Sequence, residues 1–224
     1  MPARAPLIVI NPNSSETVTA GIAAALGPLD ALGQPIRCVT LAEGPPAIES
    51  QAQADETISH LLRLAASLEA EAAGFVIACF GDPGLHALRD RTAKPVVGIQ
   101  EAALLMACSL GQRIGVISIL PASVPRHLRA YGASGLATRV VADRALGLGV
   151  AELSDAAVTE SRMIEVARRL CDEDGADVLI LGCAGMASRR ALLEAATGRP
   201  VVEPCQAAAS LAIGQISLSL THCR

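Results

Sequence analysis

Two cysteines in matching sequence surroundings are the residues of this chain best suited to chemistry. Cys79 lies in ACFG (78–81) and Cys183 in GCAG (182–185), each after an apolar run. A single cysteine at a strand end is more often a packing residue, but two at equivalent points of a repeated unit favour a function. If one is a thiolate and the other a thiol, they can deprotonate a carbon acid on one face and reprotonate it on the other. The pair therefore predicts inversion of a stereocentre next to a carbonyl group.

The residues after each cysteine fit an anion site. Gly81 and Gly185 allow close backbone approach and can direct N–H groups at an oxyanion. After Cys79, Asp82 is predicted to be a helix N-cap and Pro83 the first helical residue. A helix N-terminus at this point would lower the pKa of the thiol.

An internal duplication relates the two cysteine segments. PVVGI (95–99) resembles PVVEP (200–204), and a cysteine precedes each by about 16 residues. LIVIN (7–11) has its counterpart in IGVIS (114–118), and the distances from Asn11 to Cys79 and from Ser118 to Cys183 are 68 and 65 positions. The duplication predicts two similar lobes. The first comprises residues 1–100 with a C-terminal helix at about 206–220, and the second comprises 101–205.

Short apolar runs alternate with alanine-rich segments along the whole chain. Strands are predicted at 7–10, 36–41, 74–78, 96–99, 114–117, 138–141, 178–181 and 201–202. Helices are predicted at 15–25, 49–73, 83–91, 102–109, 123–131, 156–174, 188–196 and 207–218. This alternation indicates an α/β fold with parallel sheets, here two lobes related by a pseudo-twofold axis. The active site is expected in the cleft between them, beyond the carboxyl ends of the strands.

Composition excludes several classes of protein. The 224 residues are 51% hydrophobic and 18% charged, which excludes intrinsic disorder. A net charge of −4 with 1% aromatic residues argues against a nucleic-acid partner, and a polybasic segment for a membrane surface is absent. The apolar run at 7–10 is too short for a signal-peptide core, so a cytoplasmic location is expected.

The sequence gives no support for a metal or a cofactor. The seven cysteines form no C-x-x-C pair, and the four histidines lack metal-ligand spacing. No phosphate-binding loop or dinucleotide motif is present, and Lys94, the only lysine, precedes a proline in a predicted turn. We therefore expect a small-molecule substrate and no cofactor. Of the remaining cysteines, Cys38, Cys108 and Cys171 are interpreted as packing residues, and Cys223 as part of a frayed terminus.

Several motifs together resemble one known family. They are VINPNSS (9–15), GPPAIES (44–50), ACFGDPGL (78–85), PVVGI with EAA (95–103) and LGCAGM (181–186). In this order they resemble the aspartate/glutamate racemase superfamily, and within it the hydantoin and allantoin racemases. The resemblance implies that Cys79 and Cys183 are the two acid/base residues. Related arylmalonate decarboxylases have glycine at the first cysteine position, whereas maleate isomerases keep both cysteines.

A set of substrate-binding residues is also expected. The resemblance implies Asn13, Ser14, Pro46 and Ile48, and the duplication adds Ser118 and Leu120 as the second-lobe counterparts of the loop at 13–14. Backbone N–H groups near Phe80, Gly81, Ala184 and Gly185 are expected to hold the enolate oxygen. Two have plain structural alternatives: Asn13 could cap a helix with Glu16, and Ser118 could belong to an ordinary strand-to-helix turn. The basic cluster RHLR (126–129) is interpreted as a solvated helix face. Gln100 departs from the alanine that relatives often have at this place.

The resemblance thus implies a cofactor-independent racemase of 5-substituted hydantoins, including allantoin, that acts by cysteine proton transfer at C5. An amino-acid racemase or a maleate-type isomerase of the same superfamily is the enzymatic alternative. A protein that binds hydantoins or ureides without turnover is the non-enzymatic one. A homo-oligomer is expected from the apolar composition and the resemblance.

Overall fold

Two parallel four-stranded sheets form the framework of the protein. The computed structural model describes residues 4–154 and 156–222. The first sheet contains β1 (Leu7–Asn11), β2 (Ile36–Thr40), β3 (Gly74–Ile77) and β4 (Val96–Gly98), in the order β2-β1-β3-β4. The second contains β5 (Ile114–Ser118), β6 (Val140–Ala145), β7 (Val178–Leu181) and β8 (Val201–Val202), in the order β6-β5-β7-β8. The same strand order in both sheets confirms the α/β fold of two similar lobes.

Helices cover both faces of each sheet, which explains why the central strands are continuously apolar. The α-helices are α1 (Glu16–Leu26), α2 (Gln51–Leu68), α3 (Leu85–Arg89), α4 (Ile99–Leu110), α5 (Val124–Ala133), α6 (Ala156–Asp172), α7 (Arg190–Thr197) and α8 (Pro204–Ser217). Short 3-10 turns are η1 (Gly27–Leu32), η2 (Pro121–Ser123), η3 (Ala137–Arg139), η4 (Val150–Ser154) and η5 (Ala184–Arg189). Every residue of β1, β3, β5 and β7 is buried, as expected for parallel strands between two helical layers.

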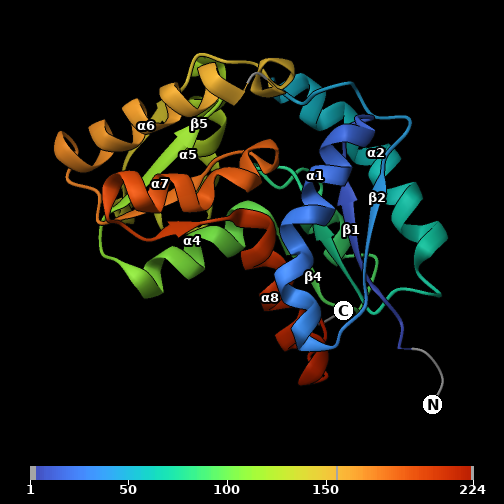
Figure 1. Cartoon of the computed structure of the whole chain (residues 1–224). Coiled ribbons are helices and arrows are strands. Elements are labelled where there is room, and N and C mark those ends of the chain that lie inside the picture. The colour runs from blue at the N-terminus through green and yellow to red at the C-terminus, as the bar shows by residue number, and fades with distance from the viewer. Residues whose placement is uncertain (1–3, 155, 223–224) are drawn as a thin grey trace.

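Two helices cross from one lobe to the other. Helix α4 follows the first sheet but packs against β7 of the second, whereas α8 follows the second sheet and packs against β3 and β4 of the first. Figure 1 shows α8 beside α1 and β4. The alanines of α8, among them Ala208 and Ala212, are fully buried and let α4 and α8 pack closely. One hydrophobic core therefore runs through both lobes, from Leu7 and Val76 to Ile114.

Two predicted helix caps are wrong. Helix α3 begins at Leu85, after Gly84 with φ of +75°, and Asp82 does not cap it. Instead, the Asp82 carboxylate accepts hydrogen bonds from the backbone N–H groups of Gln100 (2.9 Å) and Glu101 (2.8 Å) in the first turn of α4. The loop after β3 thus satisfies N–H groups that a helix cannot pair internally, because the first turn has no preceding carbonyls.

The N-cap of α1 is Ser15 and not Asn13, since the Ser15 hydroxyl accepts from the N–H of Val18. The Asn13 Oδ1 accepts instead from the N–H of Ser15 and from Asn11 Nδ2, both at 2.9 Å.

Strand β6 begins at Val140, two residues later than predicted, because 137–139 form a 3-10 turn. Within the described residues, no helix combines the length and apolar character needed to cross a membrane. Cys223 lies outside the described residues.

Candidate active site

The carboxyl ends of both sheets meet at a small cavity. Cys79 follows β3 and Cys183 follows β7, and both line this cavity, whose volume is about 30 Å³. The other lining residues are Asn13, Val18, Ile48, Ala78, Phe80, Ile119, Ser123, Arg126, Val150, Gly182, Ala184 and Gly185. The structure therefore brings together two thiols that are 104 residues apart in the sequence. The space has room for only about two water molecules.

The Cys183 sulfur lies at the start of a helical turn. Cys183 is the N-cap of η5, and its Sγ accepts a hydrogen bond from the N–H of Gly185 at 3.4 Å. Burial raises the pKa of the Cys183 thiol, while the Gly185 N–H and the Arg126 guanidinium act in the opposite direction. The backbone after Cys183 thus presents an N–H donor next to the sulfur, as the spacing of Gly185 predicts.

Burial dominates at Cys79 as well. It raises the pKa of the Cys79 thiol to about 12. Arg126 lowers this pKa, whereas Cys183 and Asp82 raise it further by smaller amounts. Because Cys183 contributes to this shift, the two sulfurs are within electrostatic range of one another. Burial therefore favours the neutral thiol form of both cysteines. The expectation that a helix N-terminus lowers the thiol pKa is outweighed by desolvation.

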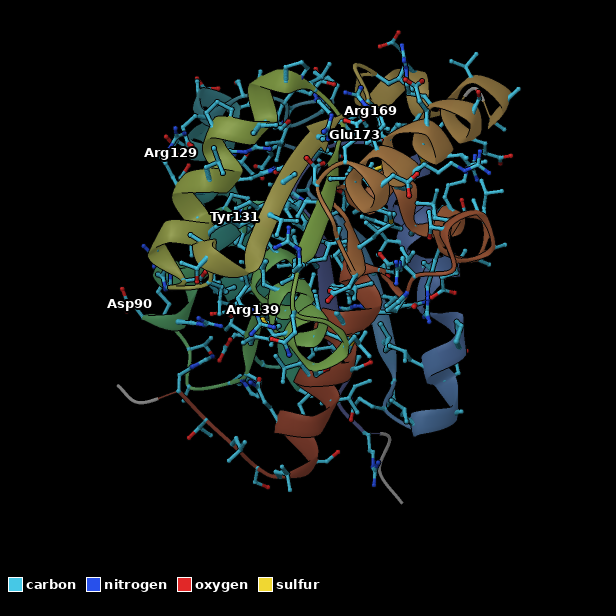
Figure 2. All side chains as sticks on the ribbon, turned by 90° about the vertical axis from the view of Figure 1, so that its left-hand side faces the viewer. Asp90, Arg129, Tyr131, Arg139, Arg169 and Glu173 are labelled. Carbon is cyan, nitrogen blue, oxygen red and sulfur yellow. The ribbon has the colours of Figure 1, made fainter. Side chains whose placement is uncertain are left out.

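Arg126 is the functional candidate that the sequence analysis missed. It is 8% exposed and lines the cavity with both cysteines, so its interpretation as part of a solvated face is wrong. His127 is also buried, whereas Leu128 and Arg129 of that cluster are exposed. Figure 2 looks onto the second lobe and shows Arg129 and Tyr131 on α5. The signal available in the sequence was the spacing of His127 and Tyr131, which places both on one helix face.

The expected substrate-binding residues divide into three groups. Five of them line the cysteine cavity: Asn13, Ile48, Phe80, Ala184 and Gly185. Gly81, with φ of +111°, lines a larger neighbouring cavity instead. Ser14, Pro46, Ser118 and Leu120 line neither cavity. Ile119, which lies between Ser118 and Leu120, lines the cysteine cavity, and so does Ser123.

Ser118 belongs to a buried polar cluster beside the site. Its hydroxyl donates to Asp143 and lies 3.1 Å from Nδ1 of His127. The Asp143 Oδ2 also accepts from the Tyr131 hydroxyl at 2.8 Å and lies 2.9 Å from His127 Nδ1. Phe80 packs edge-on against His127, with ring centroids 4.9 Å apart. Although serine, histidine and aspartate are the residue types of a hydrolase triad, Ser118 is fully buried and faces no cavity, so the cluster supports Phe80.

The described part of the chain offers no cluster of side chains for a metal ion. No group of three or more histidine, cysteine, aspartate or glutamate side chains there could hold a metal ion. The site geometry rests on two thiols, one guanidinium and backbone N–H groups. Such an arrangement can exchange protons with a carbon acid and stabilise an oxyanion.

Comparisons with known proteins show similarity to racemases along most of the chain. The hydantoin racemase of Paenarthrobacter aurescens is 34% identical over 216 residues, covering 95% of this chain and 91% of that protein. The hydantoin racemase of Rhizobium meliloti is 37% identical over 214 residues, covering 91% and 86%. The structure of allantoin racemase from Klebsiella pneumoniae superimposes with a TM-score of 0.93 at 32% identity, covering 97% of this chain and 90% of the other.

The family model described as Asp/Glu/Hydantoin racemase matches residues 7–212. That match includes both sheets and both cysteine segments. Together with the curated relatives above 30% identity, it shows that this chain belongs to the Asp/Glu/hydantoin racemase family.

Proposed function

We propose that this protein racemises 5-substituted hydantoins, a class that includes allantoin, with Cys79 and Cys183 as the two proton-transfer residues. The observation that carries the proposal is the single cavity lined by both thiols at the carboxyl ends of the two sheets. Its support is the similarity along nearly the full chain to hydantoin racemases and to allantoin racemase. The names of these relatives describe racemases of hydantoin and allantoin, and C5 is the ring carbon at which a substituted hydantoin is inverted.

The proposed reaction is a balanced proton exchange. One cysteine, as thiolate, takes the C5 proton, and the electron pair of the broken C–H bond moves into the ring carbonyl to give an enolate. The other cysteine, as thiol, gives its proton to C5 from the opposite face, and the enolate electrons return to form the new C–H bond. The protonation states of the two cysteines are then exchanged, and the reverse reaction restores them.

Backbone and side-chain donors around the cavity would hold the substrate. The N–H of Gly185 donates to Cys183 Sγ, so the donors for the developing enolate oxygen are the neighbouring backbone N–H groups near Phe80, Gly81 and Ala184. The Asn13 Oδ1 is already occupied by two donors, so the group it offers a substrate is Nδ2. Apolar Ile48 and Phe80 would exclude water from the reacting carbon.

Entry of the ring requires an opening of the site. A cavity with room for about two water molecules is smaller than a hydantoin ring. Glu49 Oε1 accepts from the N–H of Val150 at 2.9 Å, and Arg126 Nη1 donates to the carbonyl of Ser50 at 3.2 Å. These two contacts join the lobes over the cavity, so we expect them to break or lengthen when substrate enters.

The experiment follows each enantiomer of benzylhydantoin, allantoin, aspartate and glutamate in D2O by proton NMR and polarimetry. Wild-type protein should exchange the C5 proton with loss of optical rotation, well above the rate in buffer. Cys79→Ser and Cys183→Ser should each lower racemisation by about 10²- to 10⁴-fold, because a serine hydroxyl is a far weaker acid than a thiol and does not ionise near neutral pH. Cys171→Ser, in α6 away from both cavities, is the matched control and should keep activity.

Three outcomes would contradict the proposal. Full racemisation by either serine variant would exclude the two-cysteine mechanism. Absence of enzyme-dependent exchange with every hydantoin would exclude the substrate class and favour a binding role. Faster turnover of free aspartate or glutamate would favour the amino-acid racemase alternative. Homo-oligomerisation and a cytoplasmic location stay predictions, which light scattering and cell fractionation would test.

A further inference from the structure

A second, larger cavity adjoins the cavity between the cysteines. It has a volume of about 610 Å³ and shares Cys79, Phe80 and Arg126 with the small cavity. Volumes of this size are typical of small-molecule sites. Since both thiols must reach C5 at the small cavity, a substituent on C5 can extend past Cys79 into the larger space.

Arg126 stands at the junction of the two cavities without an anionic partner. It is 8% exposed, its Nη1 donates to the carbonyl of Ser50, and its buried Nε has no hydrogen-bond partner among the described residues. A Cβ at Gly81 would lie only 3.4 Å from this Nε, so glycine keeps the space in front of it open. A buried guanidinium without a carboxylate is costly unless an anion binds to it.

The acidic groups of the larger cavity are engaged elsewhere. Asp82 accepts from the backbone of α4, and Glu101 forms an ion pair with Arg89 at 2.5 Å. Asp55 accepts from Gln51 Nε2 at 2.8 Å. Arg126 is therefore the deeply buried charge of this cavity that has no counter-charge within the described residues.

Gln100 supplies a second buried donor in the same cavity. It is 2% exposed, and its Nε2 has no hydrogen-bond partner of good geometry among the described residues. It is near enough to Tyr131 to lower the pKa of that hydroxyl. An amide donor at this point adds hydrogen-bonding capacity to the cavity.

We propose that the larger cavity is the subsite for the C5 substituent and takes one that carries a carboxylate, bound by Arg126 with Gln100. The substrates are then hydantoins of acidic amino acids, such as 5-carboxymethylhydantoin and 5-(2-carboxyethyl)hydantoin. This inference rests on the proposed function. A neutral substituent would leave the guanidinium uncompensated, whereas a carboxylate can accept two charge-assisted hydrogen bonds.

Arg126 also lowers the pKa of both thiols, which suggests a rival role in stabilising the thiolate alone. The two roles predict different results. Support of the thiolate affects every substrate equally, because the thiolate is common to all of them. Recognition of the substituent affects only substrates that carry the carboxylate. Selectivity between substrates, not total activity, therefore decides between the roles.

The test compares kcat/KM for single enantiomers of 5-carboxymethylhydantoin and 5-benzylhydantoin, measured by C5 deuterium exchange. Wild-type protein should prefer the carboxylate. Arg126→Gln should lower kcat/KM for 5-carboxymethylhydantoin about 30-fold more than for 5-benzylhydantoin, and Gln100→Ala should shift the same ratio by a smaller factor. Arg162→Gln, which removes one positive charge from an exposed face of α6, should leave the ratio unchanged.

A binding measurement makes the test independent of turnover. In a Cys79→Ser/Cys183→Ser background, calorimetry should show that Arg126→Gln weakens the binding of 5-carboxymethylhydantoin by a similar factor. The affinity for 5-benzylhydantoin should stay nearly unchanged. Equal losses for both ligands, or a wild-type preference for the benzyl compound, would overturn this inference and leave the proposed function intact. Absence of exchange with both compounds in wild-type protein would instead contradict the proposed function.

Discussion

At the scale of single residues, the site is set by competition between burial and charge. Both thiols are desolvated, which favours their neutral forms, and the Arg126 guanidinium offsets part of this effect. Asp82, three residues after Cys79, shows the same competition. Burial raises the pKa of its carboxyl group to about 7, although two backbone N–H groups favour the charged form. Its charge in turn raises the pKa of Cys79.

Asp82 should make stability depend on pH. Because its folded pKa of about 7 exceeds the ordinary 3.8, the folded state holds this proton more tightly, and the resulting stability is lost as pH rises from about 4 to 7. In Asp82→Asn, the free energy of unfolding from urea titrations should fall less over this range than in wild-type protein. Asp30→Asn, in the exposed η1 turn, is the control and should keep the wild-type slope. Equal slopes for wild-type protein and Asp82→Asn would contradict the raised pKa.

At the scale of elements, the first turns of α4 and α8 have their backbone N–H groups paired with a carboxylate from different places in the chain. In the second lobe, Glu203 is the N-cap of α8 and accepts from the N–H groups of Cys205 and Gln206. In the first lobe the equivalent position is Gly98, and the carboxylate comes from Asp82 in the loop after β3. A Cβ at Gly98 would lie 2.2 Å from the Asp82 side chain, so glycine there leaves room for the carboxylate.

This arrangement predicts opposite effects of one substitution at two glycines. Gly98→Ala should destabilise the protein by about 1–3 kcal/mol, because the methyl group must displace the Asp82 carboxylate from the first turn of α4. Gly214→Ala, in α8 with no atom within 4 Å of its Cβ position, should stabilise it by about 0.5–1 kcal/mol through helix propensity. Urea titrations followed by circular dichroism give both values. An unchanged free energy of unfolding in Gly98→Ala would show that the Asp82 contact is dispensable.

At the scale of the whole molecule, the exchange of α4 and α8 joins the two lobes. Each helix packs on the sheet that it does not follow, and one core cluster contains residues of both sheets. The carboxyl ends of the sheets, which carry Cys79 and Cys183, are therefore held against one another by the core beneath them. We expect substrate entry to move the contacts over the cavity more than this shared core.

The shared core predicts cooperative unfolding of both lobes. Tyr131, the only tyrosine in a chain without tryptophan, is buried on α5 of the second lobe, so its fluorescence changes when that lobe unfolds. Thermal unfolding followed by this fluorescence should coincide with that followed by circular dichroism. Leu61→Ala, in the separate cluster of the first lobe, should lower both midpoints equally at a cost of about 2–5 kcal/mol. Separate midpoints would show that the lobes unfold independently.

The sequence by itself determined the strand framework and the meeting of the two cysteine segments. Apolar runs covered on both faces have a strong local signal, and the duplication relates Cys79 to Cys183 whatever the packing between the lobes. The duplication also led to the prediction of Ser118 as a substrate-binding residue, whereas the structure buries it against Asp143 and His127.

Only the tertiary structure decided which side of α5 faces the site. Arg126 and His127 point inward and Leu128 is 55% exposed, the reverse of the usual amphipathic pattern. The second cavity and the cap that Asp82 provides for α4 were likewise outside the reach of sequence reasoning. The physical reason is that each depends on contacts between segments distant in the chain, whereas periodicity and capping rules describe only neighbours along it.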